Sequence, residues 1–488
     1  MRATEQFSSR WALILAALGM AIGTGNIWRF PRIAAKNGGA AFIVAWIIFL
    51  FLWSIPILIA EFGIGKKTRY GTVGAFGKLL GEKYTWMGGF VGFCSMGIMF
   101  YYSVVSGWCF KYFVAATFGD LSASSGLEYW EAFAVRSYQP VFYHLLAMLI
   151  GGYVIYKGVV HGIERATKFL IPSLLALLFV GMIRALTLPG AFGGLNFLFH
   201  PDWQALTNYR VWLEALSQSA WSTGAGWGLI LTYAVYLREK EDIVLNSFIT
   251  GLGNNSASII AAMAIFPAVF ALAPLLGQSP EEVVKLTGPA NTGLTFIWVP
   301  QLFSQMAFGT LFTAIFFLAL SFAALSSLIA MIELATRIFM DAGMTRKRAI
   351  VVVVSGGFLL GLPSALNMTF WENQDWVWGC GLILSGFFVA FAVIKYGASR
   401  FRRELVNTRG NDLNVGKWYE YLMKYVIPIE FVVLLGWWFY QSITQFDPEG
   451  WWNPLHTYSV GTVVVQWAVV ILGFAAFNGW IYRKTVTN

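Results

Sequence analysis

A stretch near the start of the chain, residues 21–42, combines features that a continuous membrane helix avoids. It reads AIGTGNIWRFPRIAAKNGGAAF and follows the apolar run WALILAALGM. Gly23 and Gly25 weaken a helix, and Arg29 is costly in hydrocarbon. Unwinding a helix at this depth frees backbone carbonyls that need a partner other than lipid. We therefore expect a broken helix here, with Asn26 and free carbonyl oxygens beside the break.

Three further apolar segments contain small or polar residues. They are 218–228 (QSAWSTGAGWG), 251–260 (GLGNNSASII) and 321–333 (SFAALSSLIAMIE). Neutral oxygen ligands suit hard cations, sodium among them, and the N-terminal ends of half-helices suit a carboxylate. The side chains that offer oxygens are Asn26, Ser222, Asn254, Ser326 and Ser327. This combination predicts a co-transporter for a carboxylate-bearing solute, and close helix packing by small residues is the structural alternative.

The composition is that of a membrane protein. Of 488 residues, 58% are hydrophobic and 12% are charged. A spanning helix needs roughly 20 apolar residues. About twelve segments qualify: 11–35, 40–65, 87–118, 141–156, 168–187, 212–237, 243–275, 300–339, 349–362, 376–394, 425–441 and 461–482. Three cysteines inside these segments and four scattered histidines predict neither a disulfide framework nor a histidine–cysteine metal centre. No nucleophile–histidine–carboxylate cluster appears, so we do not expect an enzyme.

The net charge of +9 is distributed by loop. Lys and Arg gather in alternate loops, near residues 66–83, 157–168, 346–348 and 400–424, while the intervening loops are acidic. This positive-inside pattern argues against nucleic-acid binding and predicts a multi-pass protein of the plasma (inner) membrane with both termini cytoplasmic. The basic 400–424 loop also suits anionic lipid, although topology alone explains it. No cleavable signal peptide is visible.

The interrupted segments are the first and the sixth. Five spans separate their starts, so the two copies enter the membrane from opposite sides. Paired broken helices of this kind indicate a transporter built from inverted repeats, with its site near the midplane. We expect an all-α membrane protein with one transporter domain, 1–488, whose repeats cover 10–190 and 210–398, followed by helices 11 and 12 in 423–482.

Several motifs together resemble one family. They are GNIWRFPRIAAKNGGAAF, IPILIAEFGIGKKTRYG, YYSVVSGW, GIERATKFLIP, SQSAWSTGAGWG, FAALSSLIA and QDWVWG. Nearly end to end, the chain resembles the neurotransmitter:sodium symporters, which include bacterial amino-acid transporters of the leucine-transporter fold and the animal GABA, glycine and monoamine carriers. The resemblance implies about twelve helices in a 5+5 inverted repeat, with helices 1 and 6 broken.

The resemblance also implies two sodium sites and a substrate site. The first sodium site would use the Ala21 carbonyl, Asn26, Ser222 and Asn254, together with the substrate carboxylate. The second would use the carbonyls of Gly19, Ile22 and Ala323 with the hydroxyls of Ser326 and Ser327. The substrate pocket would be lined by Ala21, Gly23, Thr24, Gly25, Ile98, Tyr102, Trp221, Ser222, Gly224, Trp227, Ser327 and Met331, with Tyr102 bonded to the substrate carboxylate.

Glycine at position 23 bears on the substrate class. The monoamine carriers resemble this motif but have an aspartate there, so Gly23 predicts a substrate with its own carboxylate, most simply an amino acid. Trp221 and Trp227 stand where the family more often has phenylalanine, and tryptophan faces attract cations. A non-α zwitterion similar to GABA, taurine, betaine or creatine is therefore the alternative. A transport-inactive solute receptor of the same fold is another.

The resemblance further implies gates and an anion. Arg29 and Asp375 would close the outer side, and Tyr236 and Asp341 the cytoplasmic side, where Phe7 replaces the usual tryptophan and Arg2 is the nearest arginine. Glu61 would support the first helix. Ser258 occurs in chloride-dependent relatives, and a neutral cage holding two sodium ions favours a compensating anion. We expect chloride stimulation, with donors from Trp46, Gln218, Ser222, Asn254 and Ser258.

Overall fold

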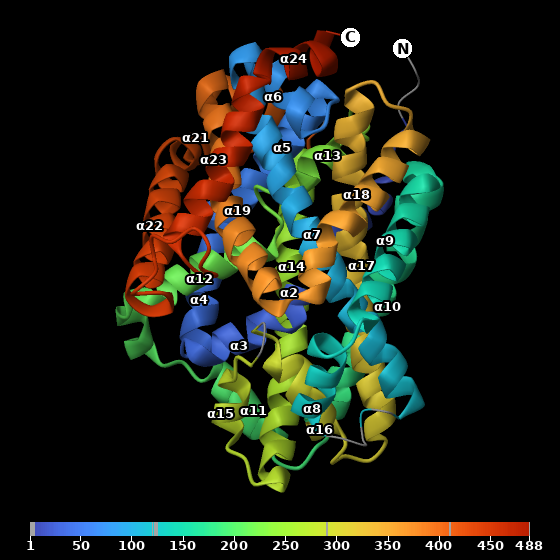
Figure 1. The fold of residues 1–488 in the computed structure, drawn as a ribbon. Coiled ribbons are helices and arrows are strands. Elements are labelled where there is room, and N and C mark those ends of the chain that lie inside the picture. The colour runs from blue at the N-terminus through green and yellow to red at the C-terminus, as the bar shows by residue number, and fades with distance from the viewer. Residues whose placement is uncertain (1–4, 120, 122–124, 289–290, 409–410, 488) are drawn as a thin grey trace.

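The computed structural model describes residues 5–487 apart from 120, 122–124, 289–290 and 409–410. Its helices run mostly along one long axis, and both ends of the chain lie at the same end of the molecule (Figure 1). We call this end the terminal side and the opposite end, where α8, α11, α15 and α16 gather, the far side. Arg2, the arginine considered for the cytoplasmic gate, lies outside the described residues.

Nine helical stretches in the described part of the chain are long and apolar enough to cross a membrane. They are Ala40–Thr68 (with α4, Ala40–Phe49, and α5, Ile55–Thr68), Glu82–Phe118 (with α7, Thr85–Phe118), Gln139–Tyr156 (α9), Val159–Leu186 (with α10, Arg165–Leu186), Ile243–Leu276 (with α14, Ile243–Leu272), Gly309–Asp341 (α17), Arg346–Leu366 (α18), Met368–Tyr396 (α19) and Trp418–Phe446 (with α21, Trp418–Tyr421, and α22, Ile427–Gln441). Two bent pairs raise the count to eleven: Arg10–Ala21 (α1) with Thr24–Lys36 (with α2, Thr24–Ile27, and α3, Arg29–Lys36), and Val460–Ala476 (α23) with Asn478–Thr487 (with α24, Asn478–Tyr482). The protein is thus an all-α, multi-pass membrane protein.

Shorter helices fill the two ends of the molecule. They are Thr72–Leu80 (α6), Gly126–Trp130 (α8), Ala191–Phe199 (α11), Pro280–Lys285 (α15), Val299–Phe303 (α16) and Ala398–Phe401 (α20). The predicted eighth span, 300–339, begins instead at Gly309, because Leu294–Phe303 forms a separate short apolar helix before it. The predicted sixth span, 212–237, is split into Tyr209–Ser222 (α12) and Leu229–Ala234 (α13), neither long enough to cross alone.

Polar residues begin several of these helices, as the sequence favours. Ser9 accepts a hydrogen bond from the Ala12 N–H at the start of α1, and Asp242 accepts from Val244 and Leu245 at the start of α14. Asn367 caps α19 in the same way through the Phe370 N–H. Such caps satisfy N–H groups that have no partner inside the helix. They fix where the helices that border the site begin.

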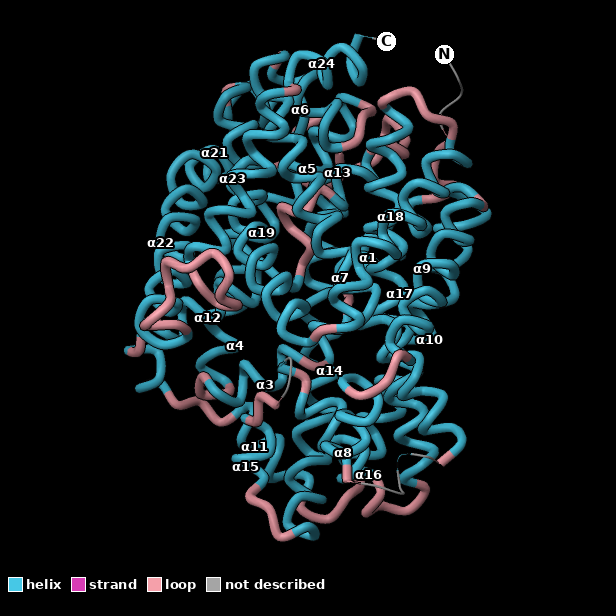
Figure 2. The backbone as a smooth tube through the Cα atoms, viewed as in Figure 1, coloured by secondary structure: helices cyan, strands magenta, loops and turns pink. Residues whose placement is uncertain are grey.

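The two breaks lie inside the bundle, where Figure 2 shows loop segments among the helices. Between α1 and α2 the backbone is extended at Ile22 and Gly23, and the two halves meet at 65°. Between α12 and α13 the three glycines 224, 226 and 228 all have positive φ, which favours glycine. A Cβ at Gly226 would lie 2.5 Å from the Gly386 Cα on α19. Glycine therefore permits both the break and its close packing.

Candidate functional site

At the first break, two backbone N–H groups lie close to a tyrosine hydroxyl and an asparagine side chain. The Thr24 N–H donates to the Tyr102 hydroxyl on α7 (3.2 Å), and the Gly23 N–H donates to the Asn26 Oδ1 (2.9 Å). Since the Tyr102 oxygen already accepts from Thr24, its own hydrogen is free to donate to a ligand. Tyr102 thus lies beside Thr24, the first residue of α2.

Asn254 on α14 brings the first predicted oxygen set together. Its side-chain Oδ1 lies 3.1 Å from the Ala21 carbonyl oxygen and 3.0 Å from that of Ser222. The Asn26 amide is 2.7 Å away and also contacts the Ser222 and Ser258 hydroxyls. Acceptor oxygens this close repel unless something positive lies between them. A cation satisfies them, as does a rotated Asn254 amide whose NH2 group faces both carbonyls.

The second predicted oxygen set joins α1 to α17. The Ser327 hydroxyl donates to the Met20 carbonyl (3.2 Å) and lies 3.5 Å from that of Gly19. The Ser326 hydroxyl donates to the Ala323 carbonyl (3.0 Å). A Cβ at Gly19 would lie 3.3 Å from the Ser326 Cβ, so the two helices pack closely. Ile22 caps the C-terminal end of α1, and its carbonyl lies in the break.

A cavity of about 600 Å³ begins at these breaks and continues toward the far side. Eleven of the twelve predicted substrate residues line it: Ala21, Gly23, Thr24, Gly25, Tyr102, Trp221, Ser222, Gly224, Trp227, Ser327 and Met331. The twelfth, Ile98, is buried but does not line it. The charged residues of the lining are Arg29, Arg32, Glu214, Glu372 and Asp375. No charged side chain of the described residues lines the cavity at the level of Gly23, Trp227 and Met331.

Two glycines set the shape of the inner part of the cavity. A Cβ at Gly23 would lie 3.0 Å from the Ser327 Oγ and 3.1 Å from the Tyr102 hydroxyl. A Cβ at Gly224 would lie 2.4 Å from the Met20 sulfur. Trp221 and Trp227 meet edge to face, with ring centroids 6.0 Å apart. The inner cavity is therefore narrow around Gly23 and aromatic opposite it.

The guanidinium of Arg29 lies along α12. It donates to the Ser217 hydroxyl (3.2 Å) and stands 5.1 Å from the Trp221 ring centroid. Among the described residues, Arg29 and Asp375 form no ion pair within 4.0 Å; Glu214 and Asp375 both act on Arg29 at longer range. The sequence reasoning missed Glu214. Its spacing of three and seven residues from Ser217 and Trp221 places all three on one helix face, a signal that could have revealed it.

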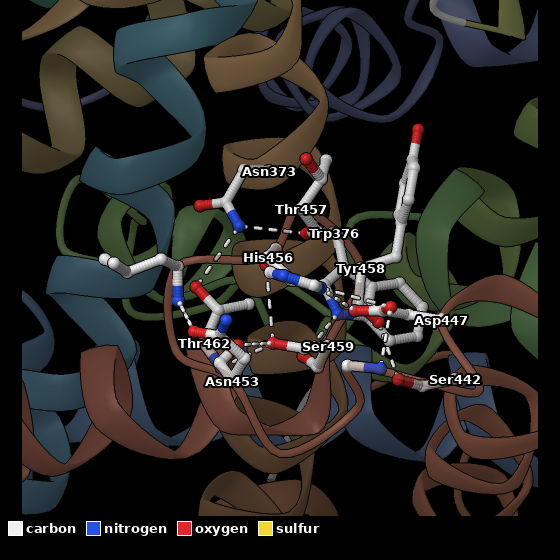
Figure 3. Close-up of polar contacts among 12 residues, drawn as sticks. Asn373, Trp376, Ser442, Asp447, Asn453, His456, Thr457, Tyr458, Ser459 and Thr462 are labelled. Atoms are coloured by element: carbon white, nitrogen blue, oxygen red, sulfur yellow. Dashed lines mark hydrogen bonds and ion pairs between the residues drawn. The ribbon is translucent and has the colours of Figure 1, made fainter.

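A loop between α22 and α23 completes the mouth of the cavity, to which Phe446 and Tyr458 contribute. Within it, the His456 Nδ1 and the Asp447 Oδ2 lie at hydrogen-bond distance (3.0 Å). Figure 3 shows how it is tied to α19. The Asn373 amide donates to the Thr457 carbonyl (2.9 Å), and the Trp376 Nε1 donates to the Ser459 carbonyl (3.2 Å). The loop thus holds the mouth open beside Asp375.

On the terminal side, the two predicted gate residues have different partners. The Tyr236 hydroxyl donates to Glu333 (2.5 Å), which also pairs with Arg346 (2.5 Å). Asp341 pairs with Arg337 (2.8 Å) and accepts from the Gly71 N–H (2.6 Å). The guanidinium of Arg337 lies 5.8 Å from the centroid of the Tyr236 ring, so it connects the two groups. Tyr236 and Asp341, the two residues expected at the cytoplasmic gate, thus lie in one network that Arg337 links.

The predicted chloride donors are only partly gathered. Ser222, Asn254 and Ser258 surround the Asn26 amide, as described above. Trp46 is buried against Phe30, with ring centroids 4.4 Å apart. Within the described part of the chain, its Nε1 and the Gln218 Oε1 have no hydrogen-bond partner. Glu61, expected to support the first helix, instead accepts from the Gly228 N–H (2.6 Å) at the start of α13.

Comparison with known proteins places this fold and site in one class, that of sodium-coupled secondary transporters. The model of the sodium:neurotransmitter symporter family matches residues 4–139 and 134–487, and the chain belongs to that family. An uncharacterised sodium-dependent transporter of Methanocaldococcus jannaschii is 32% identical over 87% of this chain and 88% of its own length. One of Bacillus subtilis is 32% identical over 88% of this chain and 96% of its own length.

A solved structure agrees with these relatives. The crystal structure of MhsT in complex with L-phenylalanine superposes with a TM-score of 0.76 and 32% identity. The match covers 88% of this chain and 99% of that one. The family comprises secondary transporters and not enzymes, which confirms the expectation from the sequence. The chain is thus a sodium-dependent transporter with the fold that its broken helices predict.

Proposed function

We propose that this protein imports an amino acid together with sodium by alternating access. One observation carries the proposal: two sets of oxygens on α1, α14 and α17 meet at the breaks that begin the cavity. The Asn254 side chain lies 3.0–3.1 Å from the Ser222 and Ala21 carbonyl oxygens, and neutral oxygens gathered in this way are the ligands that hard cations prefer. At the first break the Tyr102 hydroxyl accepts from the Thr24 N–H, so its own hydrogen can donate to an anion. A solute carboxylate would therefore complete the sodium site that lies nearest to it.

The inner cavity supports an amino acid as the substrate. A Cβ at Gly23 would lie 3.0 Å from the Ser327 Oγ and 3.1 Å from the Tyr102 hydroxyl, so glycine keeps this part of the lining clear beside two groups that can hydrogen-bond a carboxylate. The region opposite, around Trp227 and Met331, is buried and without charge among the described residues. It suits an uncharged side chain. MhsT, crystallised with L-phenylalanine, provides a related precedent.

We propose that two sodium ions bind, one in each oxygen set. They would bind the far-side-open and terminal-side-open states of the carrier with unequal affinity, and this difference would drive the cycle. In this arrangement the cavity opens to the far side. The Arg29 guanidinium packs against Trp221 of α12 and does not pair with Asp375. Closure would bring Arg29 toward Asp375 over the bound solute. We further propose that the terminal side is cytoplasmic, in the plasma membrane, and that 10–190 and 210–398 are the two inverted repeats.

Sodium-driven uptake tests the proposal directly. The purified chain in proteoliposomes should accumulate a labelled amino acid in a sodium gradient and lose accumulation when choline replaces sodium. A thermal-shift screen in sodium chloride, covering the proteinogenic amino acids and common zwitterions, identifies the substrate. If only GABA-, taurine-, betaine- or creatine-like solutes stabilise the protein, its substrate is a non-α zwitterion and not an amino acid. Binding without uptake or counterflow would make the protein a receptor.

We also propose that chloride stimulates transport. The first sodium set contains no acid among its described residues, and the Ser258 hydroxyl lies 2.8 Å from the Asn26 amide of that set. Replacing chloride by gluconate should reduce uptake severalfold. Ser258→Glu should remove that dependence by supplying a fixed negative charge. Wild-type uptake that ignores chloride removal would contradict the proposal, and so would a Ser258→Glu variant as chloride-sensitive as wild type.

A further inference from the structure

A narrow groove lies between α10, α14 and the first part of α17, near the far side of the molecule. It encloses only about 20 Å³, which excludes a compact solute and suits an extended chain that lies along it. The groove shares no lining residue with the cavity described above. It is therefore a separate feature, outside the sodium and substrate sites.

The floor of the groove consists of small residues. Alanines from all three helices line it: Ala185, Ala261, Ala264, Ala268 and Ala319. Gly181 on α10 also lines it, and a Cβ there would meet nothing within 4 Å. Small side chains allow a neighbouring chain to approach the helix backbone closely. At Gly181 the groove thus contains space that no side chain of the described residues fills.

The groove lies on a lipid-facing part of the molecule. The stretch that contains α10, Val159–Leu186, is the least buried of the nine spanning stretches in the described part of the chain. Next to groove residues in the sequence, Val180 and Ile183 on α10 and Leu311 on α17 are exposed apolar side chains. An exposed apolar surface on spanning helices contacts lipid. Hydrocarbon chains of the bilayer therefore meet this groove.

Arg184 alone carries a charge among the described residues that line the groove. It lies two residues before the end of α10 at Leu186, close to the far-side boundary of the span. Its guanidinium donates to the Thr187 hydroxyl (2.9 Å) and lies 5.8 Å from the centroid of the Phe312 ring. It pairs with no acid among the described residues. Arginine matches the geometry of phosphate, the anion that lipid headgroups supply at the membrane boundary.

We propose that the groove binds one phospholipid, whose phosphate pairs with Arg184 and whose acyl chain lies along the alanine floor. Charge and shape both favour this occupant, because an unpaired guanidinium stands at the end of an apolar groove that faces the bilayer. Ile27, the residue after Asn26 of the first oxygen set, also lines the groove. The bound chain would thus contact α2, the half-helix that begins at the first break. The inference does not depend on transport.

Native mass spectrometry of the full chain tests the inference. Wild type purified in detergent with phosphatidylglycerol should retain one lipid molecule at a concentration where surface lipid is lost. Arg184→Gln removes the phosphate partner, and Gly181→Leu fills the groove. Each variant should lower the retained fraction about fivefold or more, which corresponds to about 1 kcal/mol of binding free energy. Since the two variants change the site independently, one of them suffices if the other does not fold.

Matched variants control for the loss of a surface charge and for an added side chain. Arg165→Gln removes an exposed arginine at the start of the same helix, and Gly436→Leu fills open space on α22. Both should retain lipid as wild type does. The inference is overturned if wild type retains no lipid, or if Arg184→Gln and Gly181→Leu retain as much as their controls.

A thermal-shift measurement separates a phospholipid from a free anion. Phosphatidylglycerol should raise the melting temperature of detergent-solubilised wild type by a few degrees, and inorganic phosphate alone should not. The same rise with inorganic phosphate would overturn the inference, because Arg184 would then bind a free anion. Lipid retention is measured without uptake, so a protein that binds lipid but does not transport would contradict the proposed function alone.

Discussion

Arg29 rests on the face of Trp221, with its guanidinium 5.1 Å from the ring centroid, and does not pair with Asp375. Arg29, Trp221 and Asp375 all line the same cavity, and in the transport cycle proposed above Arg29 would leave Trp221 and approach Asp375 when the far side closes. Cation–aromatic contacts are weaker than buried ion pairs but need no desolvated acid. The open arrangement is therefore held by several modest contacts along α12.

Removing the charge of Glu214 should weaken that hold. Glu214→Gln removes one of the two acids that act on Arg29, so pairing with the other, Asp375, becomes relatively more favourable. We expect dissociation of the bound substrate to slow by about three- to tenfold, which corresponds to about 1 kcal/mol. Release of radiolabelled substrate in detergent measures it. Glu281→Gln, an exposed acid on α15, is the control, and equal rates in both variants would contradict the prediction.

A side chain at position 23 should abolish zwitterion binding. In Gly23→Ala the new Cβ meets the Ser327 Oγ at 3.0 Å and the Tyr102 hydroxyl at 3.1 Å, where the substrate carboxylate is proposed to lie. Affinity should fall at least tenfold, and further in Gly23→Asp, since two carboxylates repel. Gly356→Ala on α18 is the matched control because nothing lies within 4 Å of its Cβ and it does not line the cavity. Equilibrium binding of the substrate separates the variants.

Loss of the Ser326 hydroxyl should weaken sodium binding. Ser326→Ala removes one proposed ligand of the second site, and we expect the sodium concentration for half-maximal uptake to rise about tenfold, or about 1.4 kcal/mol. Ser321→Ala on the same helix removes an equally buried hydroxyl, which bonds only the Phe317 carbonyl (2.7 Å). That control should keep wild-type sodium dependence. A similar shift in both variants would assign Ser326 to helix packing.

The second break should not tolerate a side chain at Gly226. Its φ of +86° disfavours other residues, and a Cβ would lie 2.5 Å from the Gly386 backbone. Gly226→Ala should lower the free energy of unfolding by about 2 kcal/mol or more. The melting temperature in detergent reports the loss. Gly436→Ala, where a Cβ meets nothing within 4 Å, should leave that temperature within a degree or so. An unchanged melting temperature in Gly226→Ala would contradict the prediction and show that α19 moves to make room for the new side chain.

The sequence alone predicted the parts of the site that depend on local chemistry. Glycines and polar residues within apolar segments mark both breaks, and oxygen-bearing residues such as Asn254 and Ser326 have few other uses at that depth. Eleven of the twelve predicted substrate residues line the cavity, while Ile98 is buried outside it. Helix periodicity could not exclude Ile98, because a small rotation of α7 decides which residues reach the cavity.

Only the tertiary structure decided which charged and polar groups meet. Tyr236 bonds Glu333 and not Asp341, Arg29 lies against α12, and Glu164 holds the residues before α1. The energy of such contacts changes steeply over a few ångströms, and each group has several candidate partners on helices far apart in sequence. The sequence therefore determines which residues offer oxygen atoms at the breaks, and the packing of the helices determines which charged groups lie around them.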